Sequence, residues 1–206
     1  GGVFSAGVFR KDIVDFFGTQ VRVATLADLE LVGLDPVYVG WNLSTKFNSG
    51  SARITGFEFN ARQPLRQFGG MGRYFTVFAN ATSLKLEGNA LASFASFVPK
   101  TANWGFSFNY KRFSFVPKMN YRGLNKLVSQ PLFGPDGFQY IKPRIITDLS
   151  MAYRLTSGLS LTASAGNIFN RHLTQMHYGS LTPEYARQSL DSVYGVSFAV
   201  GVRGNF

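Results

Sequence analysis

Residues 194–206, YGVSFAVGVRGNF, decide the fold class. Most alternate positions counted from Tyr194 are bulky and apolar, whereas the positions between them hold glycine, alanine, serine, asparagine and one arginine. A period of two indicates a strand with one apolar and one polar face. The alternation runs well beyond an ordinary strand of about 5–6 residues. It is long enough to cross a bilayer, which takes about 9–11 tilted residues.

The same alternation recurs upstream, with aromatic or aliphatic residues opposite polar and charged ones. It is clearest over residues 103–111, 113–122, 145–154 and 159–166. Charged residues among the polar partners indicate that the second face contacts water. A soluble sandwich shows similar alternation, but rarely at this length or with so many aromatic residues.

Composition supports a membrane barrel over a soluble domain. The 206 residues fit one domain or part of one, and the 45% hydrophobic content excludes disorder. Only 16% of residues are charged, against about 25% in soluble domains, and mean hydropathy is +0.01. Alternating lipid-facing and lumen-facing residues average to such a value. The absence of cysteine excludes disulfide frameworks and thiol nucleophiles.

Short and long joins alternate between the expected strands. Short joins are expected near 66–72, 111–112 and 155–158, and long ones at 87–100, 124–143 and 170–191. Outer-membrane barrels pair short periplasmic turns with long extracellular loops. Residues 2–23 and 38–65 complete the count, with a short helix expected within 25–34 and a bend near 48–50. The sequence therefore predicts an all-β antiparallel meander of about eight long transmembrane strands.

Several segments resemble the C-terminal part of the barrel of TonB-dependent outer-membrane receptors. FSAGVFRKDIVDFF (4–17) resembles a strand that these receptors carry with a phenylalanine, x, lysine, aspartate, isoleucine core. FNSGSARITGFEFNARQPL (47–65) resembles a second motif strand, and residues 147–171 resemble the penultimate hairpin. The chain also closes on a phenylalanine that resembles the C-terminal assembly signal of such barrels. The matching residues are Asn48, Gly50, Ala52, Gly56 and Glu58 in the motif strand, Asn167, Phe169 and Asn170 in the hairpin, and Phe206.

The resemblance implies a larger protein with a plug, a TonB box and a barrel of about twenty-two strands. We therefore expect residues 1–206 to be the C-terminal segment of that barrel, an open curved sheet, with the plug and N-terminal strands outside it. The implied location is the bacterial outer membrane. The implied function is TonB-energised uptake of a scarce nutrient, most often a ferric siderophore, with cobalamin, haem and glycans as alternatives. The implied partners are outer-membrane lipid and lipopolysaccharide, TonB acting through the plug, the barrel assembly machinery and the nutrient.

A complete eight-stranded barrel with a structural or adhesive role is the alternative. Eight strands and this length suit such a barrel. Its first and last strands would pair, whereas those of a segment would stay apart. The many small residues expected on the lumen side fill a narrow barrel poorly, which favours the open sheet.

The predicted loop 171–191 is the possible ligand loop, because it contains His172, His177 and Tyr178. The two histidines are five residues apart, unlike the i, i+4 histidines of a zinc helix. No serine, histidine and carboxylate follow a recognisable catalytic order. We therefore predict no metal, no cofactor and no enzymatic activity.

Charged residues are expected in the lumen or at its rims. Glu58 and Asp148 fall on positions predicted to face the lumen. Lysine and arginine are spread singly, without a basic run, so binding of nucleic acid is not predicted. The basic residues expected to line the lumen or to meet anionic ligands or lipid phosphates at the rims are Arg53, Arg62, Arg73, Lys118, Arg122 and Arg154.

Overall fold

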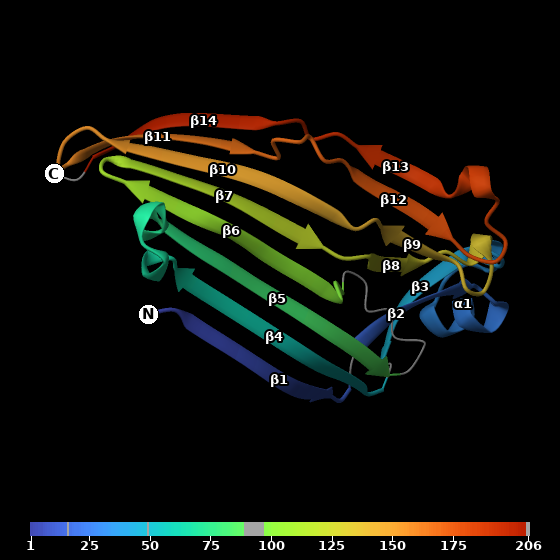
Figure 1. Ribbon diagram of the computed structural model, residues 1–206. Helices are drawn as coiled ribbons and strands as arrows, with labels where there is room; N and C mark the ends of the chain where they lie inside the picture. The colour runs from blue at the N-terminus through green and yellow to red at the C-terminus, as the bar shows by residue number, and fades with distance from the viewer. Residues whose placement is uncertain (16, 49, 89–96, 205–206) are drawn as a thin grey trace.

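The computed structural model describes residues 1–15, 17–48, 50–88 and 97–204. Eight strands form one antiparallel sheet in the order β1-β4-β5-β6-β7-β10-β11-β14 (Figure 1). This meander confirms the predicted all-β fold. The strands are β1 (Val3–Ile13), β4 (Ala52–Pro64), β5 (Phe75–Gly88), β6 (Lys100–Tyr110), β7 (Phe113–Arg122), β10 (Arg144–Arg154), β11 (Leu159–Gly166) and β14 (Ser197–Gly204).

The sheet is open. β1 and β14 lie at its two edges, and within the described residues no ladder joins them. The expected open sheet is therefore confirmed, and the described residues form no closed eight-stranded barrel. The start of β1 and the end of β14 lie at the same end of the sheet (Figure 1).

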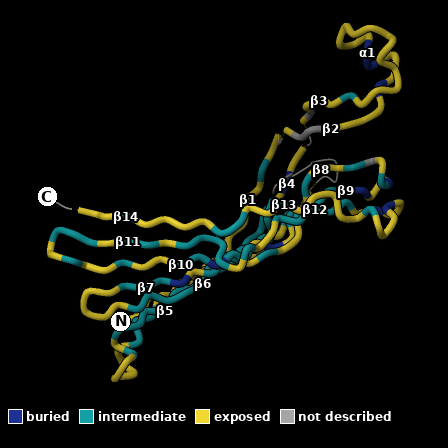
Figure 2. The backbone as a smooth tube through the Cα atoms, turned by 90° about the horizontal axis from the view of Figure 1, so that it is seen from above, coloured by how far each residue is buried: buried dark blue, intermediate teal, exposed yellow. Residues whose placement is uncertain are grey.

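The sheet is a single layer. Among the described residues, only Ala24, Leu29 and Ala52 are buried hydrophobic residues, and residues of exposed or intermediate burial dominate Figure 2. A sandwich would bury one apolar face of each of its two sheets. Here the apolar side chains have no second layer to pack against, so a soluble sandwich is excluded.

One face of the sheet is apolar. Residues paired across an antiparallel ladder share a face, and one row crosses five strands as Phe108, Phe115, Met151, Ala163 and Val200. This side, called the apolar face, also carries Phe57, Phe59, Trp104, Phe106, Phe113, Met119, Leu149, Leu161, Phe198 and Val202.

The opposite face, called the polar face, carries an asparagine row. Asn60, Asn80, Asn103 and Asn120 pair in turn across β4, β5, β6 and β7. Asn103 Nδ2 donates to Asn80 Oδ1 at 2.9 Å, and Asn120 Nδ2 donates to Asp148 Oδ2 at 3.1 Å. These contacts satisfy amide groups that an apolar environment would penalise.

The last strand has the predicted register over its described length. Phe198, Val200 and Val202 share one face at 78%, 84% and 65% exposure, and Arg203 lies on the other. The strand begins at Ser197 instead of Tyr194, because Gly195 has a left-handed φ of 75° that interrupts the extended backbone. Phe206 lies outside the described residues.

The joins predicted as long loops at 124–143 and 170–191 instead each contain a pair of short strands, which fill nearly half of their length. They form a four-stranded sheet in the order β13-β12-β9-β8. The same chain order runs through the main sheet as β14-β11-β10-β7, so each upper strand continues a lower one past an interruption (Figure 1). The upper strands are β8 (Asn125–Ser129), β9 (Phe138–Ile141), β12 (Leu173–Tyr178) and β13 (Gln188–Ser192), with short 3-10 turns at Pro131–Phe133 and Glu184–Ala186.

A second upper unit continues β1 and β4. β2 (Phe17–Val23) pairs with β3 (Asn42–Asn48), and α1 (Leu26–Val32) and a 3-10 turn (Pro36–Tyr38) lie between them in the chain. The helix falls within the predicted 25–34 range. Thr25 and Asp28 form a reciprocal capping box at its start, and Gly33 ends it at a φ of 68°. The Thr25 hydrogen bonds and the Arg22 charge lower the pKa of Asp28.

Aromatic residues gather where the strands meet the short joins. Tyr74, the last residue of the turn Gly70–Tyr74 that follows the turn Arg66–Phe68, packs edge-on against Tyr110 at 4.8 Å. Phe113 and Tyr153 pair beside them. From Phe113 to Tyr121 the strand rises about 26 Å at about 3.3 Å per residue. That rise is close to the apolar band of about 25 Å in outer-membrane barrels, before allowing for strand tilt.

Within the described residues, no helix is long and apolar enough to cross a membrane.

Candidate functional site at the strand breaks

Four long strands are interrupted between the main sheet and the upper sheet. The interruptions, called the strand breaks, fall at 123–124, 142–143, 167–172 and 193–196. Backbone hydrogen bonds bridge two of them: Gly123 N donates to Lys100 O at 2.8 Å, and Lys142 N donates to Thr174 O at 3.0 Å. Several of the predicted site residues lie at these breaks, between the main sheet and the upper sheet.

The hairpin motif residue Asn167 organises one break. Its φ is 53°, a left-handed conformation that asparagine tolerates better than most residues. Its Oδ1 accepts from Arg171 N at 2.8 Å, and its Nδ2 donates to Gly195 O at 3.1 Å. Asn167 N donates to Asp148 Oδ1 at 3.0 Å. The motif asparagine therefore ties the end of β11 to the start of β14 and to the polar face.

Asn170 and Phe169 complete that turn. Asn170 also has a left-handed φ, 47°, and its N–H donates to Asn167 O at 2.7 Å. Phe169 is exposed. These contacts give the motif a structural role in turning the chain between the two sheets.

Replacing Asn167 with alanine is expected to destabilise this turn by about 2 kcal/mol, because it loses side-chain hydrogen bonds and keeps a strained φ. Hydrogen–deuterium exchange of a peptide spanning 160–176 would measure the loss as faster exchange. Asn167→Gly, which relieves the backbone strain but lacks the amide, should recover only part of the protection. Exchange in Asn167→Ala equal to wild type would contradict the role.

A hollow of about 600 Å3, called the break hollow, opens at this level. Tyr121 and Ile145 reach it from the apolar face, together with the exposed Phe169. Its other lining residues are mostly polar or charged: Lys142, Pro143, Arg144, Asn170, Arg171, His172, Thr174, Gln188 and Asp191. The hollow is basic, because three lysine or arginine residues line it and only one carboxylate, that of Asp191, does. Two aromatic rings, of Tyr121 and Phe169, also line it.

Within this hollow, His172 is held by Asp191. The two side chains approach to 2.8 Å between Nδ1 and Oδ2, and the Thr174 hydroxyl donates to Asp191 Oδ1 at 3.0 Å. The hydrogen bonds from His172 and Thr174, with the nearby charges of His172 and Lys142, lower the pKa of Asp191.

Acidification is expected to loosen β12 from β13. The pKa of Asp191 is lowered in the folded protein, so its contribution to stability is present above its usual value of 3.8 and is lost as the pH falls through the lower folded-state pKa. The measurement is the pepsin cleavage rate within 171–191, as a ratio of Asp191→Asn to wild type at each pH. The ratio should approach one at the acid end, and a ratio independent of pH would oppose the assignment.

The three residues of the possible ligand loop do not converge. His172 lies at the break hollow, whereas the His177 ring packs on Phe133 at 4.7 Å. Tyr178 lies under the Arg187 guanidinium at 5.5 Å. The described part of the chain holds no cluster of three or more histidine or acidic residues that could bind a metal.

The motif strand residues shape a second interruption, between β3 and β4. Asn48 Oδ1 accepts from Gly50 N at 2.9 Å, and Asn48 Nδ2 donates to Asp15 Oδ1 at 3.0 Å. Gly50 has a φ of 87°, which favours glycine. Asn48 and Gly50 therefore form the expected bend, and Asp15 marks the matching interruption after β1.

The other motif residues lie on β4 below the bend. Ala52 is buried beside Ile13 and Gly88. A side chain at Gly56 would overlap the ring of Phe9, so Gly56 leaves room for that ring on the polar face. Glu58 is exposed and pairs with Gly7 and Thr82 on the polar face.

Most of the six predicted basic residues follow the expected distribution. Arg62, Lys118, Arg122 and Arg154 lie on the polar face, and Arg73 stacks over the Tyr74 ring at 4.8 Å near the short joins. Arg53 lies on the other side, at the upper end of the apolar face.

Arg53 belongs to a group of charged residues at the upper end of the apolar face that the sequence pattern did not predict. Along β1, Phe4 and Val8 lie on the apolar face, whereas Phe9 lies on the polar face. Arg10 and Asp12 therefore share the apolar face with Phe4 and Val8. This change of side was the available signal. The resemblance of residues 9–13 to a family motif does not indicate which face each of these residues occupies.

A family model described as TonB dependent receptor-like, beta-barrel matches residues 1–170. Among solved structures, the outer membrane transporter YddB from Escherichia coli is similar, with a TM-score of 0.57 and 10% sequence identity. The match covers 100% of this chain and 30% of that transporter, so the chain spans about a third of its length. At this identity the likeness shows the fold. The search of curated proteins found no match.

Proposed function

The chain belongs to the TonB-dependent receptor-like β-barrel family, and we propose that it forms part of the wall of an outer-membrane receptor for TonB-energised nutrient uptake. A ferric siderophore is the proposed nutrient class, as the resemblance of the motif strands implies. The chain is proposed to be the C-terminal segment of that barrel. It carries no proposed catalytic role.

The observation that supports this function is the two-faced single layer. Among the described residues no second layer covers the apolar face, and a bilayer would remove this face from water. The polar face carries the asparagine row, Glu58 and Asp148, which suit a hydrated lumen. A wall with these two faces separates lipid from an aqueous passage.

The partners follow from this placement. Outer-membrane lipid and lipopolysaccharide would contact the apolar face and its rims. The barrel assembly machinery would recognise the chain end at Phe206. TonB would act through a plug domain outside residues 1–206, and the upper strands would meet the nutrient first.

The test is uptake by cells that carry the full-length gene. Iron-starved cells receive radioactive iron as hydroxamate, catecholate or citrate complexes, and accumulation is compared between wild type, a gene deletion and a strain lacking TonB. At least one complex should lose its accumulation in both mutants. If cobalamin or haem is instead the nutrient whose uptake requires TonB, the proposal of a receptor stands and the proposed siderophore is wrong. Uptake unaffected by TonB loss for every ligand would overturn the proposal.

A further inference from the structure

We infer that the upper rim of β1, β4 and β5 binds the phosphate groups of an acylated outer-leaflet lipid. The inference rests on the proposed function, because it places the apolar face in the outer membrane. It adds a specific lipid site, defined below, on the outside of the wall.

On the apolar-face side of these strands, called the outward side below, three successive rows of residues paired across the strands change from apolar to charged. The lowest is Val8, Phe57 and Ser83, and the next is Arg10, Thr55 and Lys85. The third is Asp12, Arg53 and Glu87. Rows on one face are about 7 Å apart, since each residue rises about 3.4 Å. The cations Arg10 and Lys85 therefore lie one row above a surface suited to acyl chains.

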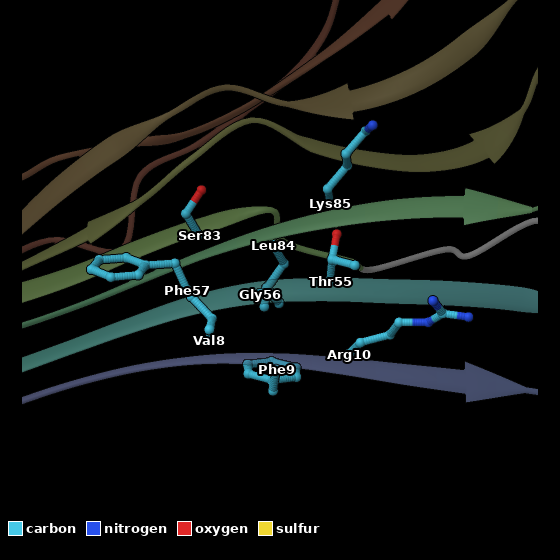
Figure 3. Close-up of a pocket in the computed structure, with 9 residues that line it drawn as sticks. All are labelled: Val8, Phe9, Arg10, Thr55, Gly56, Phe57, Ser83, Leu84 and Lys85. Carbon is cyan, nitrogen blue, oxygen red and sulfur yellow. The ribbon is translucent and has the colours of Figure 1, made fainter.

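A hollow of about 600 Å3, called the rim hollow, lies over the first two rows. In Figure 3, Thr55, Ser83 and Lys85 project to one side of the strands, and Phe9 projects to the other. The backbone of Gly56 lies between the rows, and its missing side chain would point toward Phe9 and Leu84 on the polar face. The outward hollow is thus bounded by apolar side chains below and cations above.

The charges of the third row organise these cations. Asp12 accepts from Arg10 Nε at 2.9 Å and from Arg53 Nε at 2.7 Å, so one carboxylate orients two guanidinium groups. Glu87 pairs with Lys85. Each arginine donates to Asp12 through its Nε, which is one of the five N–H donors of a guanidinium, so its two terminal NH2 groups can also bind a phosphate.

The order of the rows favours a lipid over a free anion. The row that borders the apolar surface has two cations and no carboxylate, while both carboxylates lie one row farther away. A phosphate attached near acyl chains can contact this row while its chains lie along Val8 and Phe57. Val8 is 83% exposed, so it is open to such a chain. A free phosphate gains nothing from the apolar row.

The test measures lipid binding to the purified full-length protein in detergent by native mass spectrometry. The probe is diphosphorylated lipid A, compared with its dephosphorylated form. Arg10→Gln combined with Lys85→Gln should weaken binding of the phosphorylated form at least about tenfold. The control is Lys11→Gln, which removes one positive charge from the polar face of β1, next to Arg10, and should bind like wild type.

A charge-preserving variant, Arg10→Lys with Lys85→Arg, should stay close to wild type and separates lost charge from lost folding. Equal binding by the charge-neutral variant, or equal binding of dephosphorylated lipid A, would overturn the site. Displacement of lipid A by millimolar inorganic phosphate would show a free-anion site instead. The lipid-binding assay contains neither nutrient nor TonB. Its result can therefore be interpreted even if TonB-energised uptake is not observed, and a negative lipid-binding result does not change the outcome of the uptake test.

Discussion

Leu149→Arg is expected to destabilise the folded barrel in a bilayer by about 2–4 kcal/mol, the cost of an arginine near the midplane of a lipid-facing strand. Leu149 lies midway along β10 on the apolar face, paired with Pro117 and Ala165. No acidic residue lies in this row to compensate the charge. Guanidinium unfolding of the full-length barrel in lipid vesicles, followed by tryptophan fluorescence, would measure the loss.

The matched control is Ser150→Arg, one residue along the same strand. Ser150 is exposed on the polar face, paired with Val116 and Ser164. An arginine there can extend into water, so the expected loss is below about 1 kcal/mol. Equal losses for the two variants would contradict the assignment of the faces.

Gly105→Ala is expected to cost about 3 kcal/mol through overpacking of β6 against β7. A Cβ at Gly105 would overlap the carbonyl oxygen of Pro117 and lie 2.8 Å from the ring of Phe78. Backbone cannot turn aside as a flexible side chain can, so the two strands would have to separate. Pro117 has no backbone N–H, so the ladder that joins β7 to its neighbours already lacks one hydrogen-bond donor at this position.

Gly7→Ala separates this local effect from the general cost of replacing a strand glycine. Nothing lies within 4 Å of a Cβ built at Gly7, and its φ is outside the left-handed region. The same unfolding titration should show little loss for this variant, because alanine fits there. If both alanine variants unfold alike, the close approach of β6 and β7 does not limit stability.

The eight long strands could be predicted because each face imposes its own chemistry over many residues. A strand such as β10 alternates Ile145, Leu149 and Met151 with Asp148 and Ser150, and only a two-sided strand explains that order. The helix near Leu26–Val32 could be predicted as well, and its capping pair and Gly33 account for its ends.

The upper strands could not be predicted, because they are short and contain turn signals. β9 has four residues and follows Gly134 and Gly137, which suggest a loop. Contacts between residues distant in the chain contribute to their pairing, such as Lys126 over the Phe138 ring at 3.3 Å and Gln139 to Gln175 at 2.6 Å. Burial of Lys126 lowers its pKa. The break hollow likewise depends on two strand breaks, 142–143 and 167–172, that lie far apart in the chain but side by side in the fold.

The strand breaks also bear on how such a wall can diverge in evolution. In an uninterrupted strand, inserting one residue flips every later side chain to the other face. Here irregular backbone at 142–143 and 167–172 separates the upper strands from the lower ones. Length changes in the hairpins of β8 with β9 and β12 with β13 need not propagate into the lipid-facing register. The upper wall can therefore acquire new shapes while the lower sheet conserves its pairing.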